Sequence, residues 1–281
     1  MKKIWVIGSG IMGSGIAQTC CQAGYHVSIM DTDGPCLDKA VHNIERALQK
    51  LEKKQLLDQK AADIFANLKK ETSFNGAATA DMVIEAVFEN ITLKQDIFKA
   101  LESICGLDTI FATNTSAIPI TDISAAIAHP QRFLGLHFFN PVHKMKLVEI
   151  IKSLATSEDT VETARQFVFT LAKEPVVVNR DSAGFIVNRI NGMAFLEALR
   201  LLEKGVASVE DIDKAIRLGL GNPMGPFELM DLVGLDVVLN ARLNIYNETR
   251  EPAHFPPGIL KNMVKAGYLG RKTGKGFYDY T

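Results

Sequence analysis

The chain is poor in the residues from which several protein classes are built. It has four cysteines in 281 residues, and none of them is spaced as CxxC: Cys20, Cys21, Cys36 and Cys105. We therefore expect no metal site, and free thiols in a reducing, cytoplasmic compartment. The net charge is only −1, so the basic excess typical of proteins that bind nucleic acid is missing.

Long apolar runs are also missing. No segment approaches 18 consecutive apolar residues, the length that a membrane-spanning helix needs. Met1-Lys2-Lys3 followed by Ile4–Ile7 resembles the start of a secretory signal, but Gly8, Ser9 and Gly10 interrupt the apolar run at once. We interpret this run as the first buried strand of a protein with no membrane partner.

A length of 281 residues with 47% hydrophobic content is enough for two domains. The first half alternates helical patterns, such as Gly13–Ala23, Cys36–Lys54 and Val161–Lys173, with short β-branched apolar runs. These runs are Ile4–Ile7, His26–Met30, Met82–Val87, Thr109–Ala112, Phe133–Phe139 and Pro175–Val178. Alternating strands and helices predict a Rossmann-type doubly wound α/β domain with a buried parallel sheet.

The pattern becomes helical from about Gly184. Phe185–Glu203 predicts one long helix, Ser208 begins a second and Pro226 begins a third that runs toward Asn247. Pro256-Pro257 precedes a short last helix that ends near Gly267. We predict an α/β domain over residues 1–183 and an all-helical domain over residues 184–281.

A glycine-rich loop directly follows the first predicted strand and opens a helix. Its residues are Gly8, Ser9, Gly10, Ile11, Met12 and Gly13. The glycines permit a tight turn, a close approach of the backbone to a pyrophosphate, and close packing of helix on strand. Asp31 ends the second strand, where its carboxylate suits the ribose hydroxyls of NAD and would repel the 2′-phosphate of NADP. The alternative is a glycine-rich turn that binds nothing.

Histidine is a suitable proton-transfer group for a dehydrogenase near neutral pH. Among the six histidines, His137 lies at the end of a predicted strand, on the edge of the sheet where ligands are expected to bind. Glu149 is a lone carboxylate in the apolar run Leu147–Ile151 and needs a partner. A hairpin-like return could bring Glu149 to His137; a core histidine and a solvated glutamate are the alternative.

Two further polar residues are candidates for binding a substrate oxygen. Ser116 follows the strand Thr109–Ala112, but its hydroxyl could equally cap a turn. Asn188 is polar on the otherwise apolar first helix of the second domain, and its amide could instead cap a neighbouring carbonyl.

Taken together, these motifs resemble the 3-hydroxyacyl-CoA dehydrogenase family, and within it most of all the short bacterial 3-hydroxybutyryl-CoA dehydrogenases. The resemblance covers essentially the whole chain. It includes the Gly8–Gly13 loop, Val87-Phe-Glu-Asn90 with Lys94, Thr113-Asn-Thr-Ser116, His137-Phe-Phe-Asn-Pro141, Asp181–Arg189, Gly225–Asp231 and Gly270–Tyr278.

The resemblance implies a role for each matching position. His137 matches the catalytic base, Glu149 its partner, and Ser116 and Asn188 the residues that bind the reacting oxygen. Positions around the nicotinamide and ribose are matched by Glu89, Lys94, Asn114 and Asn140, and the adenosine-ribose acid by Asp31. Lys54 matches a lysine that contacts CoA. A family serine that also contacts CoA is Ala47 here, and Lys50 and Lys53 could replace part of that contact. The alternative for these lysines is a solvated helix end.

The resemblance also implies an activity. This is the NAD-dependent interconversion of (S)-3-hydroxyacyl-CoA, such as 3-hydroxybutyryl-CoA, and 3-oxoacyl-CoA in fatty acid or butyrate metabolism, by a homodimer joined through the helical domain. One rival is a 3-hydroxyacid dehydrogenase of the hydroxyisobutyrate type, which uses a lysine base where this chain has Asn188. The other is an NAD-sensing protein without catalysis.

Overall fold

One eight-stranded sheet organises the first part of the computed structural model, which describes residues 1–281. The strands are β1 (Lys3–Ile7), β2 (His26–Met30), β3 (Leu68–Glu71), β4 (Met82–Glu85), β5 (Ile110–Thr113), β6 (Phe133–Phe138), β7 (Leu147–Lys152) and β8 (Glu174–Val178). Their order across the sheet is β3-β2-β1-β4-β5-β6-β7-β8. The first six strands are mutually parallel, β7 runs antiparallel to β6, and β8 is parallel to β7. The predicted Rossmann-type fold is confirmed.

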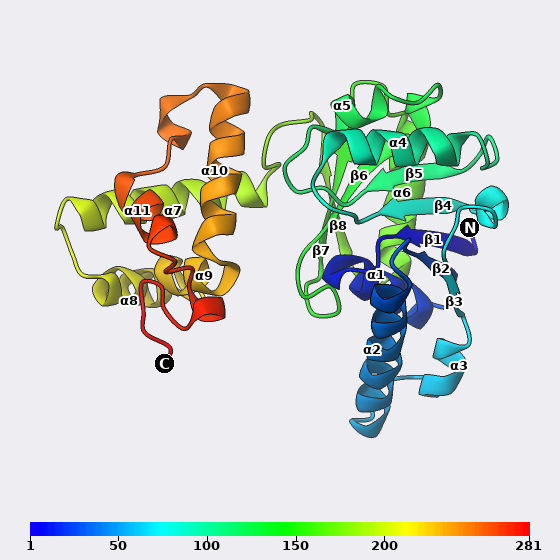
Figure 1. Ribbon diagram of the computed structural model, residues 1–281, viewed down its shortest axis with the longest axis horizontal. Coiled ribbons are helices and arrows are strands. Elements are labelled where there is room, and N and C mark those ends of the chain that lie inside the picture. The colour runs from blue at the N-terminus through cyan, green and yellow to red at the C-terminus, as the bar shows by residue number, and fades with distance from the viewer. The chain divides into compact units, whose positions relative to one another are not determined.

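The chain divides into two compact units, Met1–Ser182 (unit 1) and Ala183–Thr281 (unit 2). The helices of unit 1 are α1 (Ile11–Gln22), α2 (Gly34–Lys53), α3 (Ala61–Phe65), α4 (Ile91–Glu102), α5 (Ile120–Ser124) and α6 (Glu158–Thr170). One face of α2 packs on the core, with Leu37, Ile44 and Leu48 buried. In Figure 1, α2 projects well beyond the sheet.

Unit 2 is built from helices, as predicted. They are α7 (Val187–Glu203), α8 (Val209–Leu220), α9 (Pro226–Val233), α10 (Leu235–Thr249) and α11 (Gly258–Lys265). They enclose a core of their own around Leu196, Leu199, Phe227 and Met230. None of the helices in the chain is both long and apolar enough to cross a bilayer.

Two details differ from the sequence-based expectations. The prediction of a single helix from Pro226 toward Asn247 is wrong. Two helices, α9 and α10, are separated by Gly234, whose φ is 104°. Strand β3 was not predicted at all. Its sequence, Leu-Lys-Lys-Glu, contains one apolar residue because an edge strand buries little surface.

Strand direction determines where polar residues gather. The carboxyl ends of β1, β2, β4, β5 and β6 all lie at one edge of the sheet, because these strands are parallel. The strand order reverses between β1 and β4, which is where open α/β sheets bind ligands. This edge is therefore the expected position of a ligand site.

Candidate active site

The glycine-rich loop connects β1 to α1 and has the geometry that a dinucleotide requires. A Cβ at Gly8, where φ is +101°, would lie 2.6 Å from the Ala86 carbonyl oxygen. A Cβ at Gly13 would lie 1.9 Å from the Gly8 carbonyl oxygen, so the helix approaches the loop this closely only because residue 13 is glycine. A Cβ at Gly10 would have no atom within 4 Å, which leaves open space beside the backbone where a pyrophosphate would approach.

The amino end of α1 and Asp31 complete this binding surface. No side chain caps α1, so its first N–H groups remain available to phosphate oxygens, and neighbouring Ile11 is 78% exposed. Asp31 follows β2 and accepts hydrogen bonds from the Ser9 N–H at 2.8 Å and the Ser9 hydroxyl at 2.7 Å. Partial burial raises the pKa of Asp31, but hydrogen bonds from Asp33 and Ser9 outweigh it and hold the pKa below its ordinary value. These residues fit a dinucleotide: α1 offers free N–H groups for phosphate, and Asp31 offers an ionised carboxylate for hydroxyl groups.

His137 and Glu149 face each other across the antiparallel pair β6–β7. The His137 Nδ1 lies 2.7 Å from the Glu149 Oε2, and the two residues are only 3% and 0% exposed. An ionised carboxylate can only accept, so Nδ1 carries a proton, and in the neutral imidazole Nε2 is then the atom with the lone pair. The hairpin-like return that would bring these residues together is therefore present, and Glu149 is not a solvated glutamate.

Ser116 lies on the other side of the imidazole ring. It follows β5, and its Oγ is 3.1 Å from the His137 Nε2. Ser116 is exposed, unlike His137, so the hydroxyl is at the surface of the carboxyl edge. Ser116, His137 and Glu149 thus form one hydrogen-bonded series that runs from solvent to the interior of the sheet.

The other residues predicted near the nicotinamide lie along the same edge but differ in their surroundings. Asn114 is buried, and its Oδ1 accepts a hydrogen bond from the Phe138 N–H. Asn140 is exposed and precedes a cis peptide bond to Pro141. Glu89 accepts hydrogen bonds from the turn that contains Ser116, whereas Lys94 is 1% exposed and ion-paired.

Sequence reasoning missed Glu85 and Thr113, which end the neighbouring strands β4 and β5. Glu85 is fully buried, and its Oε2 accepts a hydrogen bond of 2.7 Å from the Thr113 hydroxyl. The signal was available, since Glu85 is a lone carboxylate in an apolar strand just as Glu149 is.

The remaining predicted residues lie elsewhere. Lys50 and Lys54 are exposed at the carboxyl end of α2, with Lys54 as its C-cap residue. Asn188 belongs to unit 2, on the first turn of α7, where its carbonyl oxygen accepts a 2.9 Å hydrogen bond from the Arg242 guanidinium.

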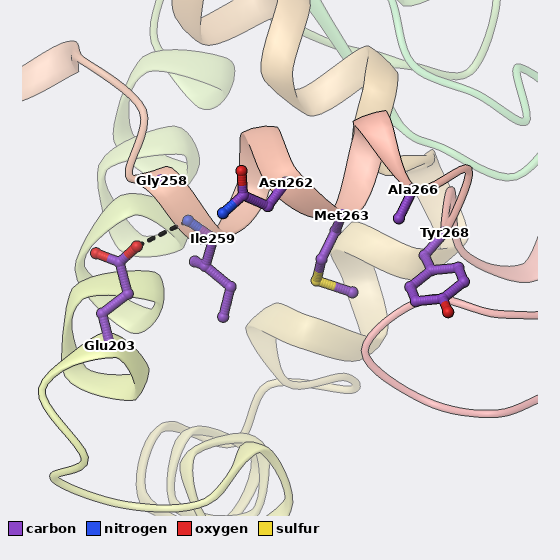
Figure 2. Close-up of a pocket in the computed structure, with 7 residues that line it drawn as sticks. All are labelled: Glu203, Gly258, Ile259, Asn262, Met263, Ala266 and Tyr268. Carbon is purple, nitrogen blue, oxygen red and sulfur yellow. Dashed lines mark hydrogen bonds between the residues drawn. The ribbon is translucent and has the colours of Figure 1, made fainter.

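Unit 2 has a hollow of its own that contains none of the predicted site residues. It encloses about 450 Å³, and Figure 2 shows the residues that line it: Glu203, Gly258, Ile259, Asn262, Met263, Ala266 and Tyr268. The Glu203 carboxylate accepts a 2.7 Å hydrogen bond from the Ile259 N–H, so its charge caps the start of α11. The hollow therefore offers a structural carboxylate rather than a reactive one.

A Rossmann-type sheet, a glycine-rich loop with space for a pyrophosphate and a carboxylate after β2 are together the features of a dinucleotide-binding domain. Residues 3–182 match the model of the 3-hydroxyacyl-CoA dehydrogenase NAD binding domain, and residues 184–280 match that of the 3-hydroxyacyl-CoA dehydrogenase C-terminal domain. The chain therefore belongs to the 3-hydroxyacyl-CoA dehydrogenase family, and it binds NAD.

Individual relatives agree with this assignment. The mitochondrial hydroxyacyl-coenzyme A dehydrogenase of Rattus norvegicus is 44% identical, with 100% of this chain and 91% of the relative aligned. The 3-hydroxybutyryl-CoA dehydrogenase of Clostridioides difficile is 42% identical, with 99% of each chain aligned. The crystal structure of (S)-3-hydroxybutyryl-CoA dehydrogenase from Ralstonia eutropha superposes with a TM-score of 0.96 at 40% identity, and the alignment covers 100% of this chain and 99% of that one.

Proposed function

We propose that this enzyme interconverts (S)-3-hydroxybutyryl-CoA and acetoacetyl-CoA, with His137 and Glu149 as its general-base pair. The observation that carries the proposal is the series Ser116–His137–Glu149, with contacts of 3.1 and 2.7 Å at the carboxyl edge beside the NAD loop. The four-carbon substrate is favoured because bacterial relatives at 38–42% identity are named 3-hydroxybutyryl-CoA dehydrogenases.

In the oxidation direction, the Nε2 of His137 takes the proton of the 3-hydroxyl group. Glu149 holds the Nδ1–H and stabilises the imidazolium that forms, and burial strengthens this interaction because few water molecules screen it. Ser116 donates a hydrogen bond to the substrate oxygen in place of its present contact with Nε2. NAD held at the Gly8–Gly13 loop would supply the hydride acceptor for this oxidation.

Other residues serve binding in this proposal. Asn188 positions the substrate, and Lys54 with Lys50 contacts the CoA phosphates. Asn114, Asn140, Glu89 and Lys94 line the surroundings of the nicotinamide and its ribose. In this proposal, residues 1–183 form the NAD-binding domain, and residues 184–281 form the domain that contacts substrate and joins two chains into a cytoplasmic homodimer.

The proposal is tested by following NADH oxidation with acetoacetyl-CoA. We expect turnover in the wild type, and a loss of roughly 10²–10⁴-fold in kcat for His137→Gln with an unchanged Kd for NADH. Glu149→Gln keeps the size of the side chain but removes its charge. This variant should have a lower kcat. The pH–rate profile for oxidation of 3-hydroxybutyryl-CoA should move toward lower pH, because the imidazolium of His137 loses its counter-ion.

The chain contains a matched control. His129 Nδ1 lies 3.1 Å from the Glu102 Oε1, another His–Glu contact, and His129→Gln should leave kcat unchanged. If His137→Gln turns over like the wild type, His137 is not the base. Reduction of free acetoacetate as fast as its CoA thioester would favour the hydroxyacid dehydrogenase class, and no turnover of either substrate would favour an NAD-sensing protein.

A further inference from the structure

A buried arginine connects two helices of unit 2. Arg242 belongs to α10 and is only 3% exposed. Its Nη2 donates a 2.9 Å hydrogen bond to the carbonyl oxygen of Asn188, on the first turn of α7. Asn188 positions the substrate in the proposed function, so Arg242 holds the backbone of a proposed site residue.

The glycine at position 192 makes this contact possible. A Cβ on Gly192 would lie 1.7 Å from the Nη1 and 2.0 Å from the Cζ of Arg242. The guanidinium therefore lies against the backbone of α7, in space that any other residue at position 192 would fill. Glycine inside a helix is less stable than alanine, so α7 is weakened at the point where it accommodates the arginine.

Stability does not account for this arginine. Burial lowers the pKa of the Arg242 guanidinium, and no carboxylate is near enough to raise it. Arginine nevertheless stays protonated in proteins, so the side chain is a buried cation without a counter-ion. Its Nη1 also has no hydrogen-bond partner. An uncompensated buried charge and an unsatisfied donor are both destabilising, and apolar side chains of similar size often make a more stable core.

We infer that Arg242 is a positioning residue for the proposed reaction: it fixes the first turn of α7, and through that turn the Asn188 amide that binds the substrate. The hydrogen bond goes to the backbone carbonyl, so the Asn188 side chain stays available. A charged donor makes such a bond roughly twice as strong as a neutral one does. The inference rests on the proposed function for the role of Asn188, and it adds a residue from α10.

Amide hydrogen exchange in the protein without substrate tests the positioning directly. The N–H groups of Arg189 and Ile190 donate 3.0 Å hydrogen bonds to carbonyl oxygens just before α7. Methionine is apolar and cannot donate to the Asn188 carbonyl, so both N–H groups should exchange faster in Arg242→Met. Unchanged exchange at both positions would show that Arg242 does not hold this turn.

Steady-state kinetics measure the consequence for the reaction. With acetoacetyl-CoA, kcat should fall about tenfold in Arg242→Met, since a displacement of roughly 1 Å can cost up to about 10²-fold. The Kd for NADH should be unchanged, because the glycine-rich loop belongs to unit 1.

Gly192→Ala separates positioning from stability. Its Cβ displaces the guanidinium, so kcat should fall about as far as in Arg242→Met. In the double variant Gly192→Ala/Arg242→Met, the new methyl group fills the space, no unpaired cation is buried and alanine favours the helix. Its thermal midpoint should equal or exceed that of the wild type while kcat stays low. If kcat recovers together with the thermal midpoint, the arginine is only structural and the inference fails.

A double-mutant cycle with Asn188 tests whether Arg242 acts through that residue. Asn188→Ala removes the side-chain amide but keeps the carbonyl that Arg242 contacts. Arg242→Met should therefore cause no further loss of kcat in the Asn188→Ala background. The same tenfold loss in both backgrounds would mean that the two residues act independently, which contradicts the inference.

Arg200 is the matched control, because it is another arginine of unit 2 that donates to a backbone carbonyl. Its Nη2 lies 2.7 Å from the carbonyl oxygen of Ala253, and Arg200→Met should leave kcat unchanged. Failure of the proposed function is seen separately, as absence of turnover in the wild type while Arg242→Met still speeds amide exchange at the start of α7.

Discussion

His137 and His129 each lie against a glutamate, and burial distinguishes them. The side chains of His137 and Glu149 are 4% and 1% exposed, whereas those of His129 and Glu102 are 43% and 16% exposed. A carboxylate acts more strongly on an imidazole where water is excluded, because the local dielectric constant is low. The buried pair, His137 and Glu149, therefore suits the proposed proton transfer, whereas the more exposed pair, His129 and Glu102, holds a surface turn.

Asp31 should make the enzyme strongly selective for NADH over NADPH. An aspartate is ionised at neutral pH, and the pKa of Asp31 lies below its ordinary value, so in the proposed contact its carboxylate would attract ribose hydroxyls and repel a 2′-phosphate. Losing two hydrogen bonds to a charged group, at roughly 1.5 kcal/mol each, predicts a preference of about 10²-fold in kcat/KM.

Steady-state kinetics with both cofactors measure this preference. Asp31→Asn should reduce it sharply. Asp33→Asn is the matched control, because Asp33 lies two residues away and caps α2 through the Cys36 N–H. Equal efficiency with NADH and NADPH in the wild type would show that Asp31 does not face the ribose.

Some residues of the site were predictable from sequence and others were not. Glu149 was found because a lone carboxylate in an apolar strand needs a partner, and its pairing with His137 depends on the register of one hairpin. The position of Ser116 beside the same imidazole was not predictable, since it depends on a turn whose conformation is held by the distant Glu89. Periodicity reports which face is buried, but it does not report such long-range contacts.

At the level of elements, helix ends were harder to predict than helices. The apolar pattern of residues 226–247 continues through Gly234, so nothing in the periodicity marks the break between α9 and α10. A Cβ at Gly234 would lie 3.0 Å from both the Asp236 Oδ1 and the Lys272 Nζ. The break therefore goes with the positive φ of Gly234, and the Asp236–Lys272 salt bridge lies beside it.

Gly234→Ala should consequently destabilise the protein. A φ of 104° is strained for an L side chain, and the expected cost is about 1–3 kcal/mol. Gly219→Ala is the matched control in α8, where a Cβ meets nothing within 4 Å and alanine should gain roughly 0.5–1 kcal/mol. Denaturant midpoints measure both changes, and a Gly234→Ala variant as stable as the wild type would show that the break tolerates a side chain.

The carboxyl end of α2 carries the proposed contact with CoA. Lys50, Lys53 and Lys54 are exposed there, and Figure 1 shows this end of the helix away from the sheet. Lys54→Glu should raise the KM for acetoacetyl-CoA about threefold at low ionic strength, and less at high salt, because exposed charges interact weakly and are screened.

Two comparisons make this prediction specific. Lys39→Glu changes the same charge on the same helix near its other end and should leave the KM unchanged. A thioester of acetoacetate with N-acetylcysteamine lacks phosphates, so Lys54→Glu should not affect its reduction. An equal loss on both substrates, or none at low salt, would mean that these lysines form only a solvated helix end.

At the scale of the whole molecule, each unit has its own core, and the chain terminus is part of unit 2. The buried Asp213 accepts the Tyr278 hydroxyl at 2.9 Å, and the buried Asp231 accepts the Phe277 and Tyr278 N–H groups at 3.0 and 2.9 Å. Two carboxylates thus attach the last residues to α8 and α9, and the terminal segment is tightly held rather than a free tail.

Unit 2 also has large apolar side chains at its surface, outside its own core. Leu218 and Leu220 at the end of α8 are 76% and 70% exposed, and Leu220 borders an apolar groove of about 260 Å³. Exposed apolar surface of this kind is typical of a protein interface, which supports the proposed homodimer. Sedimentation should therefore report about twice the protomer mass of 30.8 kDa.

Leu220→Lys should weaken that dimer. Removing a leucine from a buried interface costs roughly 1.5–3 kcal/mol, and a lysine adds a charge to be desolvated, so the dissociation constant should rise at least about tenfold. Leu154→Lys is the control, since Leu154 is 93% exposed in unit 1 and its replacement should leave the dissociation constant unchanged. Because both leucines are exposed in the single chain, neither variant should lose its fold, and the thermal midpoints at low concentration verify this. A wild-type protein that sediments at 30.8 kDa at every concentration would remove the homodimer from the proposal and leave the exposed leucines of α8 without that role.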